Sequence, residues 1–367
     1  MINLKKLGLS ALAGSLVAVS AQAGEMAVTG SANVTYKEQG SGKADSFGTD
    51  KDVSFTGTGE LDNGWNFVVS TTLDDAYAVS SSYTSITMGD MGTVQFGADT
   101  GGVSGGYDEE VPQAYEQTSD GQQNSANIVG NRMDSNMIVY NSPSFDLGAG
   151  VGAKFGLEYS KSANGTAAND GGTATDSDAS TNVDDQFGRG LGLGVTLSYD
   201  TFAFGVYGAT RENITRKTAE QTNAVVGNDK RGDDVQGVAF VKYAYGPVAV
   251  GYSAAYHDSG LSGNAVASTT AKTVGEASGY FDARSMSIAF NVNENLSVSL
   301  TETIDKYNPQ SKVGAEREVE QDTTAIQVAY SMGAMSIKAY NMDTKNPGYD
   351  EDAEDVSVNE IALGLAF

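Results

Sequence analysis

Hydrophobic side chains alternate with small or polar ones along many short stretches of this chain, which is the two-residue period of a β-strand. In 147–159 every odd position is hydrophobic, and every even position is glycine, lysine or glutamate. The stretches 191–199 and 248–256 repeat the pattern. One face of each strand therefore suits hydrocarbon, and the other face suits water.

The last seven residues, 361–367, continue this alternation and end on an aromatic side chain, Phe367. In water, an exposed terminal strand with one hydrophobic face invites aggregation. The strand makes sense if lipid covers its hydrophobic face and both of its edges are paired in a closed barrel. A terminal aromatic strand also resembles the signal by which bacterial outer-membrane proteins are recognised for insertion.

Short and long connections alternate between the strands, and they predict 16 strands with both chain ends on one side. Tight turns are expected near 62–64, 89–92, 141–146, 200–201, 246–247, 291–295 and 331–334. Longer polar connections are expected near 38–51, 74–81, 98–133, 161–189, 212–233, 258–279, 306–321 and 343–355. A soluble sandwich also alternates, but it seldom places long loops at every second connection. The predicted fold is all-β: a 16-stranded antiparallel transmembrane β-barrel with an inward-folded constriction loop.

The first 23 residues have the features of a secretory signal peptide. Two lysines precede a short apolar stretch, and Ala21-Gln22-Ala23 is a small-residue cleavage site. We therefore expect residues 1–23 to be removed and residues 24–367 to form one barrel domain. No later run of ~18 apolar residues predicts a spanning helix.

The chain is strongly acidic, with a formal net charge of −25. Removing residues 1–23 takes away two lysines and no acid, which leaves −27. Such a charge repels nucleic acid phosphates, so no nucleic acid partner is expected, and it favours cations. There is no cysteine, and therefore neither a disulfide nor a thiolate metal site is expected.

The connection 98–131 differs in composition from the other loops, because it contains no Lys, Arg or His. Its acidic residues are Asp99, Asp108, Glu109, Glu110, Glu116 and Asp120. A barrel of this size encloses a lumen too wide to select small solutes, so something must narrow it. A loop folded inward does so, and its carboxylates then set the field in the constriction. The alternative is one more solvated outer loop.

Two segments beside this loop resemble a known family. Residues 89–97 resemble the hairpin that precedes the constriction loop in the trimeric general porins of Gram-negative outer membranes, particularly those of alphaproteobacteria. Arg132 and the stretch 136–145 resemble the strand and turn that follow that loop. With the signal peptide and Phe367, the resemblance covers the whole mature chain.

The resemblance implies a homotrimer of water-filled pores in the outer membrane, reached through the periplasm and surrounded by lipid and lipopolysaccharide. Such pores pass ions and small hydrophilic solutes passively, without a cofactor. It also implies an acidic loop facing basic side chains on the wall. Carried over by position, the acidic side is Asp108, Glu109, Glu110, Glu116 and Asp120. The basic candidates by strand parity are Lys37, Arg132, Lys154 and Lys242, followed by Arg189 and Arg211.

One position departs from the family. Porins commonly carry arginine directly after the glycine that corresponds to Gly97, and here that residue is Ala98. The loss of one wall cation leaves a field dominated by carboxylates. We therefore predict a preference for cations.

Other functions are also open. One alternative is a sugar-selective pore, for which Tyr107 and Tyr115 are candidate contacts. Another is a non-conducting surface-structural or adhesin barrel. Catalysis is poorly supported, because a Ser-His pair would rest on His257 alone, and we expect no enzyme. Metal ligands stay unknown, although 173–178 with Asp184 and Asp185 offers oxygen ligands suited to Ca²⁺.

Overall fold

The computed structural model describes residues 24–40, 45–98, 102–118, 125, 137–161, 163, 187–213, 230–258, 260–262, 279–309 and 318–367. The predicted signal peptide 1–23 and the candidate calcium segment with Asp184 and Asp185 lie outside the described residues. In the part of the chain that is described, no helix combines the length and apolarity needed to cross a bilayer.

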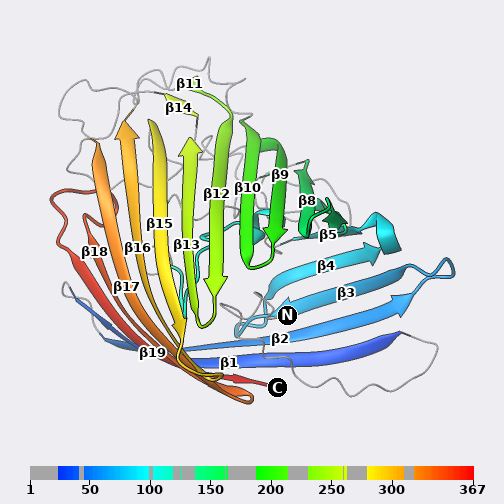
Figure 1. Ribbon diagram of the computed structural model, residues 1–367, viewed down its shortest axis with the longest axis horizontal. Helices are drawn as coiled ribbons and strands as arrows, with labels where there is room; N and C mark the ends of the chain where they lie inside the picture. Colours follow the sequence, from blue (N-terminus) through cyan, green and yellow to red (C-terminus); the bar gives the residue numbers. More distant parts are fainter. Residues whose placement is uncertain are drawn as a thin grey trace.

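Nearly all of the regular structure is β-strand (Figure 1). The strands are β1 (Glu25–Gln39), β2 (Ser46–Glu60), β3 (Asn66–Leu73), β4 (Val79–Thr87), β5 (Thr93–Ala98), β6 (Met137–Asn141), β7 (Phe145–Asp146), β8 (Val151–Ser160), β9 (Phe187–Tyr199), β10 (Phe202–Asn213), β11 (Lys230–Arg231), β12 (Asp234–Tyr245), β13 (Val248–Asp258), β14 (Leu261–Ser262), β15 (Gly279–Asn291), β16 (Leu296–Pro309), β17 (Val319–Met332), β18 (Met335–Lys345) and β19 (Val356–Ala366). Two short 3-10 turns, η2 (Gly89–Met91) and η3 (Ser104–Gly106), complete the described elements.

The sheet closes on itself, which confirms the predicted barrel. Each wall strand pairs antiparallel with the next, and β1 pairs with both β2 and β19. The large sheet has 17 strands, and because β6 and the two-residue β7 both pair along β8, they occupy one place in a wall of 16. The ladder continues to the last residue, since the Phe367 amide donates to the Gly30 carbonyl (3.0 Å). The separate pair β11 and β14 lies outside this wall.

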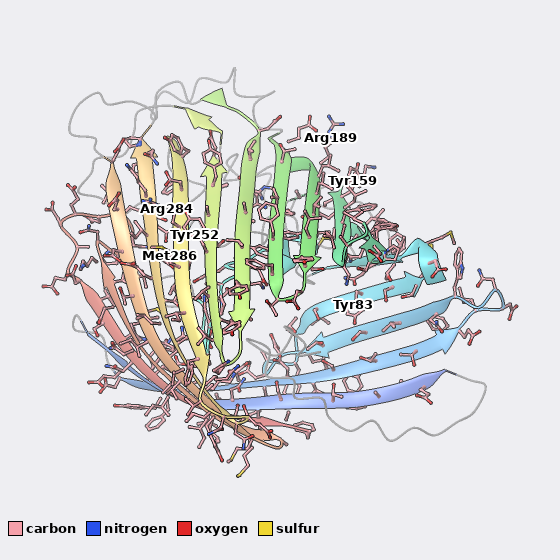
Figure 2. All side chains as sticks on the ribbon, in the orientation of Figure 1. Tyr83, Tyr159, Arg189, Tyr252, Arg284 and Met286 are labelled. Carbon is pink, nitrogen blue, oxygen red and sulfur yellow. The ribbon has the colours of Figure 1, made fainter. Side chains whose placement is uncertain are left out.

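The outer face of the wall carries the large hydrophobic side chains (Figure 2). Tyr159, Tyr252 and Met286 are each about 40% exposed, at 41%, 39% and 43%. Alternate positions on the same strands face inward and are mostly small or polar, with Phe281 of β15 as a large hydrophobic exception. The outer face therefore suits lipid and the inner face suits water, as the alternation predicted.

Candidate functional site

The loop between β5 and β6 lies inside the barrel along the described segment 102–118. The Tyr107 hydroxyl is 3.0 Å from Thr196 Oγ1 on β9. Farther along, the Ala114 amide donates to Ser299 Oγ on β16 (2.9 Å), and the Tyr115 hydroxyl donates to Glu360 on β19 (2.7 Å). The segment therefore follows the inner wall from β8 to β19, which agrees with the predicted inward-folded loop.

A buried carboxylate on β8 holds the beginning of this segment. Glu158 is 1% exposed, and its Oε2 accepts hydrogen bonds from the amides of Val103 (2.6 Å) and Ser104 (3.3 Å). Its Oε1 accepts from the Tyr207 hydroxyl of β10. Because both of its carboxyl oxygens accept hydrogen bonds, Glu158 anchors the loop base to two wall strands.

Glycines on the inner wall give the loop its seat. The Tyr107 ring lies directly over Gly194 of β9 and packs between Tyr207 and Phe240, with ring centroids 5.5 and 5.8 Å away. On β13, Gly251 faces Pro112 so closely that a Cβ there would overlap its ring. The sequence pattern indicated water-facing glycines, whereas the structure uses them for close approach of the loop.

Glu109 belongs to the interior of the loop. It is 2% exposed, and its carboxylate accepts hydrogen bonds from the Thr118 amide (2.9 Å), the Thr118 hydroxyl and Gln113 Nε2 (3.1 Å). Thr118 Oγ1 also lies 2.6 Å from Thr303 Oγ1 on β16. This carboxylate therefore stabilises the loop and joins it to the wall, instead of standing on an exposed loop surface.

The loop tip rests on a row of wall residues that lie at one level across neighbouring strands. We call Ser299, Gln327, Tyr340 and Glu360, which are consecutive register partners on β16 to β19, the docking row. Gln327 holds the loop twice, because its Oε1 accepts from the Tyr115 amide (2.8 Å) and its Nε2 donates to the Glu116 carbonyl (2.6 Å). The backbone at the tip is thus fixed by side chains of the wall.

The structure brings one predicted acid to one predicted base. Glu110 of the loop forms an ion pair with Lys242 of β12, and both side chains are about a quarter exposed. Lys37 of β1 pairs instead with Glu360 of β19, at 3.0 Å between Nζ and Oε2. Lys154 of β8 is exposed, and the described residues contain no ion pair for it.

The other predicted site residues are placed as follows. Asp108 and Glu116 are half-buried in the loop. Asp120 and Arg132 lie outside the described residues. Arg189 is exposed and lies 3.7 Å from a Glu212 carboxylate oxygen.

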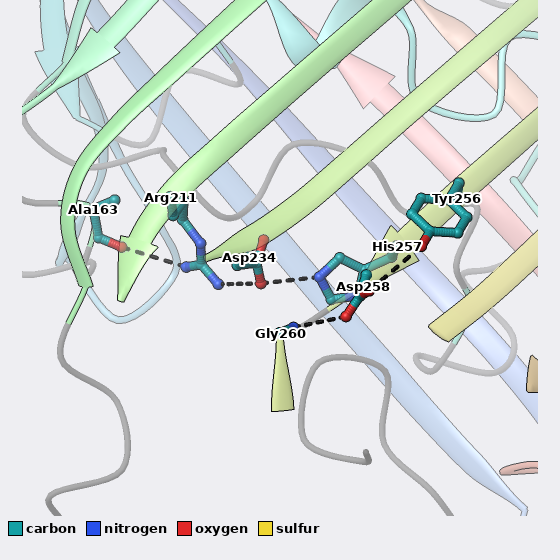
Figure 3. Close-up of polar contacts among 7 residues, drawn as sticks. All are labelled: Ala163, Arg211, Asp234, Tyr256, His257, Asp258 and Gly260. Carbon is teal, nitrogen blue, oxygen red and sulfur yellow. Dashed lines mark hydrogen bonds and ion pairs between the residues drawn. The ribbon is translucent and has the colours of Figure 1, made fainter. Parts of the chain in front are cut away.

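Arg211 lies at the long-loop end of the wall, in a buried cluster (Figure 3). Its Nη2 is 2.9 Å from Asp234 Oδ2, which is also 2.9 Å from Nε2 of His257, and its Nη1 donates to the Ala163 carbonyl. The candidate catalytic histidine therefore contacts a carboxylate–guanidinium pair that ties β10, β12 and β13 together.

Sequence reasoning missed two residues that matter for the lumen. Lys338 on the inner face of β18 places its Nζ 5.0 Å from the centre of the Tyr115 ring, and strand parity alone could have found it. Tyr349, in the connection between β18 and β19, is completely buried against Phe281, with ring centroids 5.0 Å apart. The neighbouring Gly348 amide donates to Gln321 of β17 (2.7 Å). A second loop therefore folds inward at the outer mouth, and no sequence signal marked it.

A closed 16-strand barrel with a lipid-facing exterior and a loop fixed inside its lumen defines an outer-membrane β-barrel of the channel type. The family profile of Gram-negative porins matches residues 8–366, and the chain belongs to that family. No curated protein sequence matches the chain.

Solved structures share the fold. OmpF of Salmonella typhi, in complex with daunomycin, has a TM-score of 0.67 at 12% identity, covering 95% of this chain and 99% of that one. OmpT of Vibrio cholerae has a TM-score of 0.60 at 10% identity, with the same coverage of both chains. DcaP, an outer membrane channel of Acinetobacter baumannii, also has a TM-score of 0.60 at 10% identity and covers the same shares. At such low identities the likeness concerns the fold alone.

Proposed function

We propose that this porin is a non-specific diffusion channel for ions and small hydrophilic solutes, with a preference for cations. In this proposal residues 1–23 direct export and are removed, 24–367 form the pore, and 98–131 narrow it. The observation that carries the proposal is the attachment of segment 102–118 along the inner wall from β8 to β19. A loop held there leaves passage only between itself and the remaining wall.

The wall that remains supports passage of hydrophilic solutes. Hydroxyl groups line the inner face of β2 and β3, where Ser54 lies 2.8 Å from Thr72 and Thr56 lies 3.0 Å from Ser70. Inner-facing positions of β2 to β5, as far as these strands are described, carry no Lys or Arg. A neutral or acidic polar surface of this kind lets many hydrophilic solutes pass and does not repel cations.

The charge arrangement supports the cation preference. Lys242 is neutralised by Glu110, and Lys37 is neutralised by Glu360. The basic wall that the family resemblance implies is therefore reduced, on the described residues, to Lys154 and Lys338. In a chain with a net charge of −25, the remaining field favours cations.

A planar-bilayer measurement tests both parts of the proposal. We expect ohmic single-channel steps, and in a potassium chloride gradient we expect a reversal potential with the sign of potassium permeation. Deletion of 98–131 should raise the conductance and weaken ion discrimination. A reversal potential of the opposite sign in the intact protein would refute the cation preference, and the absence of conductance would refute the channel.

The sugar-selective alternative is not favoured by the aromatic residues. Tyr107 is 6% exposed and stacks on Tyr207, and the hydroxyl of Tyr115 is engaged by Glu360. These rings support the loop and leave little surface for a sugar. The absence of saturable block by added oligosaccharides would agree with this assignment.

We extend two further properties to this chain as part of the proposal. One solved neighbour, OmpT of Vibrio cholerae, is described as a trimer form, and it has a TM-score of 0.53 at 10% identity. A homotrimer in contact with outer-membrane lipid and lipopolysaccharide is therefore proposed here as well. Light scattering of the detergent-solubilised protein should give three times the mature chain mass after the detergent is subtracted.

A further inference from the structure

Glu360 of β19 joins three parts of the molecule that are far apart in the sequence. Its Oε2 lies 3.0 Å from Lys37 Nζ on β1 and accepts a hydrogen bond from the Tyr340 hydroxyl of β18 (3.2 Å). Its Oε1 accepts from the hydroxyl of Tyr115 in the inward loop (2.7 Å). The side chain is 7% exposed, so water contributes little to these contacts.

The location of this carboxylate is also specific. Glu360 and Lys37 are direct register partners on β19 and β1, the strand pair that closes the barrel. The loop tip therefore attaches at the junction of the first and last strands. Because both attachments use one carboxylate, the position of the loop and the charge of the wall lysine depend on the same residue.

We propose that Glu360 is a positioning and selectivity residue of the pore, which holds the tip of the loop against the closing strands and masks the charge of Lys37. The inference rests on the channel function proposed above. It assigns a role in that function to a carboxylate that lies outside the loop. The two oxygens of this carboxylate have separate roles. Oε1 positions the loop, whereas Oε2 compensates the lysine.

The environment of Tyr115 supports the positioning task. Burial, together with the adjacent Glu360 carboxylate, raises the pKa of the Tyr115 phenol above its usual range. The phenol therefore remains protonated and donates to Glu360 at neutral pH. Its ring is also covered by Lys338, whose Nζ is 5.0 Å from the ring centre, so the tip is held from two sides.

The effect of the Lys37 charge on ion permeation can be estimated. Lys37 is 30% exposed, and without its partner it would place an uncompensated positive charge at the lumen wall. A unit charge about 8 Å from a passing ion in water changes that ion's free energy enough to alter its local concentration about twofold. Cations and anions respond in opposite directions, so the ratio of their permeabilities should change about two- to fivefold.

Two single substitutions separate the tasks. Glu360→Gln keeps an oxygen that can accept from Tyr115 but removes the charge, so we expect the conductance of the native protein with a cation-to-anion permeability ratio about two- to fivefold lower. Tyr115→Phe removes only the loop hydrogen bond, so we expect a larger or noisier open-channel current with an unchanged permeability ratio. A double variant, Glu360→Gln with Lys37→Met, restores neutrality and should return the ratio to the native value.

The control is Glu302→Gln, the same chemical change on the exposed outer face of β16, which should leave both readouts unchanged. Each variant is first compared with the native protein by circular dichroism and by oligomer mass. A native permeability ratio in Glu360→Gln, or a failure of the double variant to restore the ratio, would overturn the charge task. Native conductance and noise in Tyr115→Phe would overturn the positioning task. The absence of conductance in the native protein would instead refute the proposed channel function itself.

Discussion

The glycine under Tyr107 is the sharpest test of how the loop is seated. In the structure a Cβ on Gly194 would overlap the Tyr107 ring, so Gly194→Ala cannot be accommodated unless the ring moves. The ring is also fixed by Tyr207 and Phe240 and by the hydrogen bond to Thr196. The substitution therefore acts on the loop through one contact and leaves its sequence intact.

The cost can be worked out from the contacts that must be lost. Overpacking of a filled site costs about 1–3 kcal/mol, and the hydrogen bond between Tyr107 and Thr196 contributes about 0.5–1.5 kcal/mol. The sum, about 1.5–4.5 kcal/mol, weakens the seating equilibrium of the loop about 10- to 2,000-fold. We expect Gly194→Ala to show noisier current and higher mean conductance than the native protein.

Two measurements check this outcome. Bilayer recordings report the pore, and amide hydrogen exchange at Val103 and Ser104, which donate to Glu158, reports whether the loop base detaches. Gly208→Ala on β10 is the matched control, since its added Cβ would meet nothing closer than 4.0 Å. If Gly194→Ala matched Gly208→Ala in current noise and in exchange, the reasoning about the glycine seat would be wrong.

Further expectations concern the charges and the second inward loop. Glu158→Ala leaves two loop amides without their acceptor, at about 1–3 kcal/mol for each unsatisfied group, and bilayer recordings should show a wider, noisier pore; an unchanged current would contradict the anchor. Lys242→Met leaves Glu110 unpaired, so the reversal potential should move further toward potassium, and a shift toward chloride would contradict the pairing. Tyr349→Ala should make 346–355 more sensitive to protease, with native resistance as the contrary result. The pKa of the Tyr115 phenol is raised in the seated loop, so in a detached loop this phenol ionises at a lower pH. The free energy of seating should therefore be independent of pH up to about pH 10, the ordinary tyrosine pKa, and become less favourable above it. Conductance measured from pH 7 to 11 would reveal any earlier change.

The wall could be predicted from the sequence because lipid imposes one rule on every strand. A strand with hydrocarbon on one side and water on the other must alternate, and the tight turns between such strands are short and rich in glycine and asparagine. The rule fails where charged residues interrupt the alternation. β2 begins at Ser46, inside the predicted loop 38–51, because the charged run Asp50, Lys51 and Asp52 breaks the pattern of hydrophobic and polar positions.

Only part of the candidate site could be predicted from the sequence in this way. The acidic composition of 98–131 identified the loop that folds inward, since composition is a local property. The residues that receive the loop are separated from it by up to 245 positions, as for Tyr115 and Glu360, and no local pattern distinguishes Gln327 from any other inward glutamine. Lys338 was within reach of strand parity, whereas Tyr349 required knowledge of which wall residues lie beside its loop.

The carboxylates of the loop also show why a charge count overstates the field in a pore. The Glu109 carboxylate is buried and accepts hydrogen bonds within the loop, and Glu110 is neutralised by Lys242. On the wall, Lys37 is neutralised in turn by Glu360, so losses occur on both sides of the lumen. Selectivity then depends on the charges that remain without a partner, and on the inner faces of β2 to β5, which as far as they are described carry hydroxyls and acids but no base. Removing a pairing partner should therefore alter ion preference more than removing a charge that is already buried in the loop.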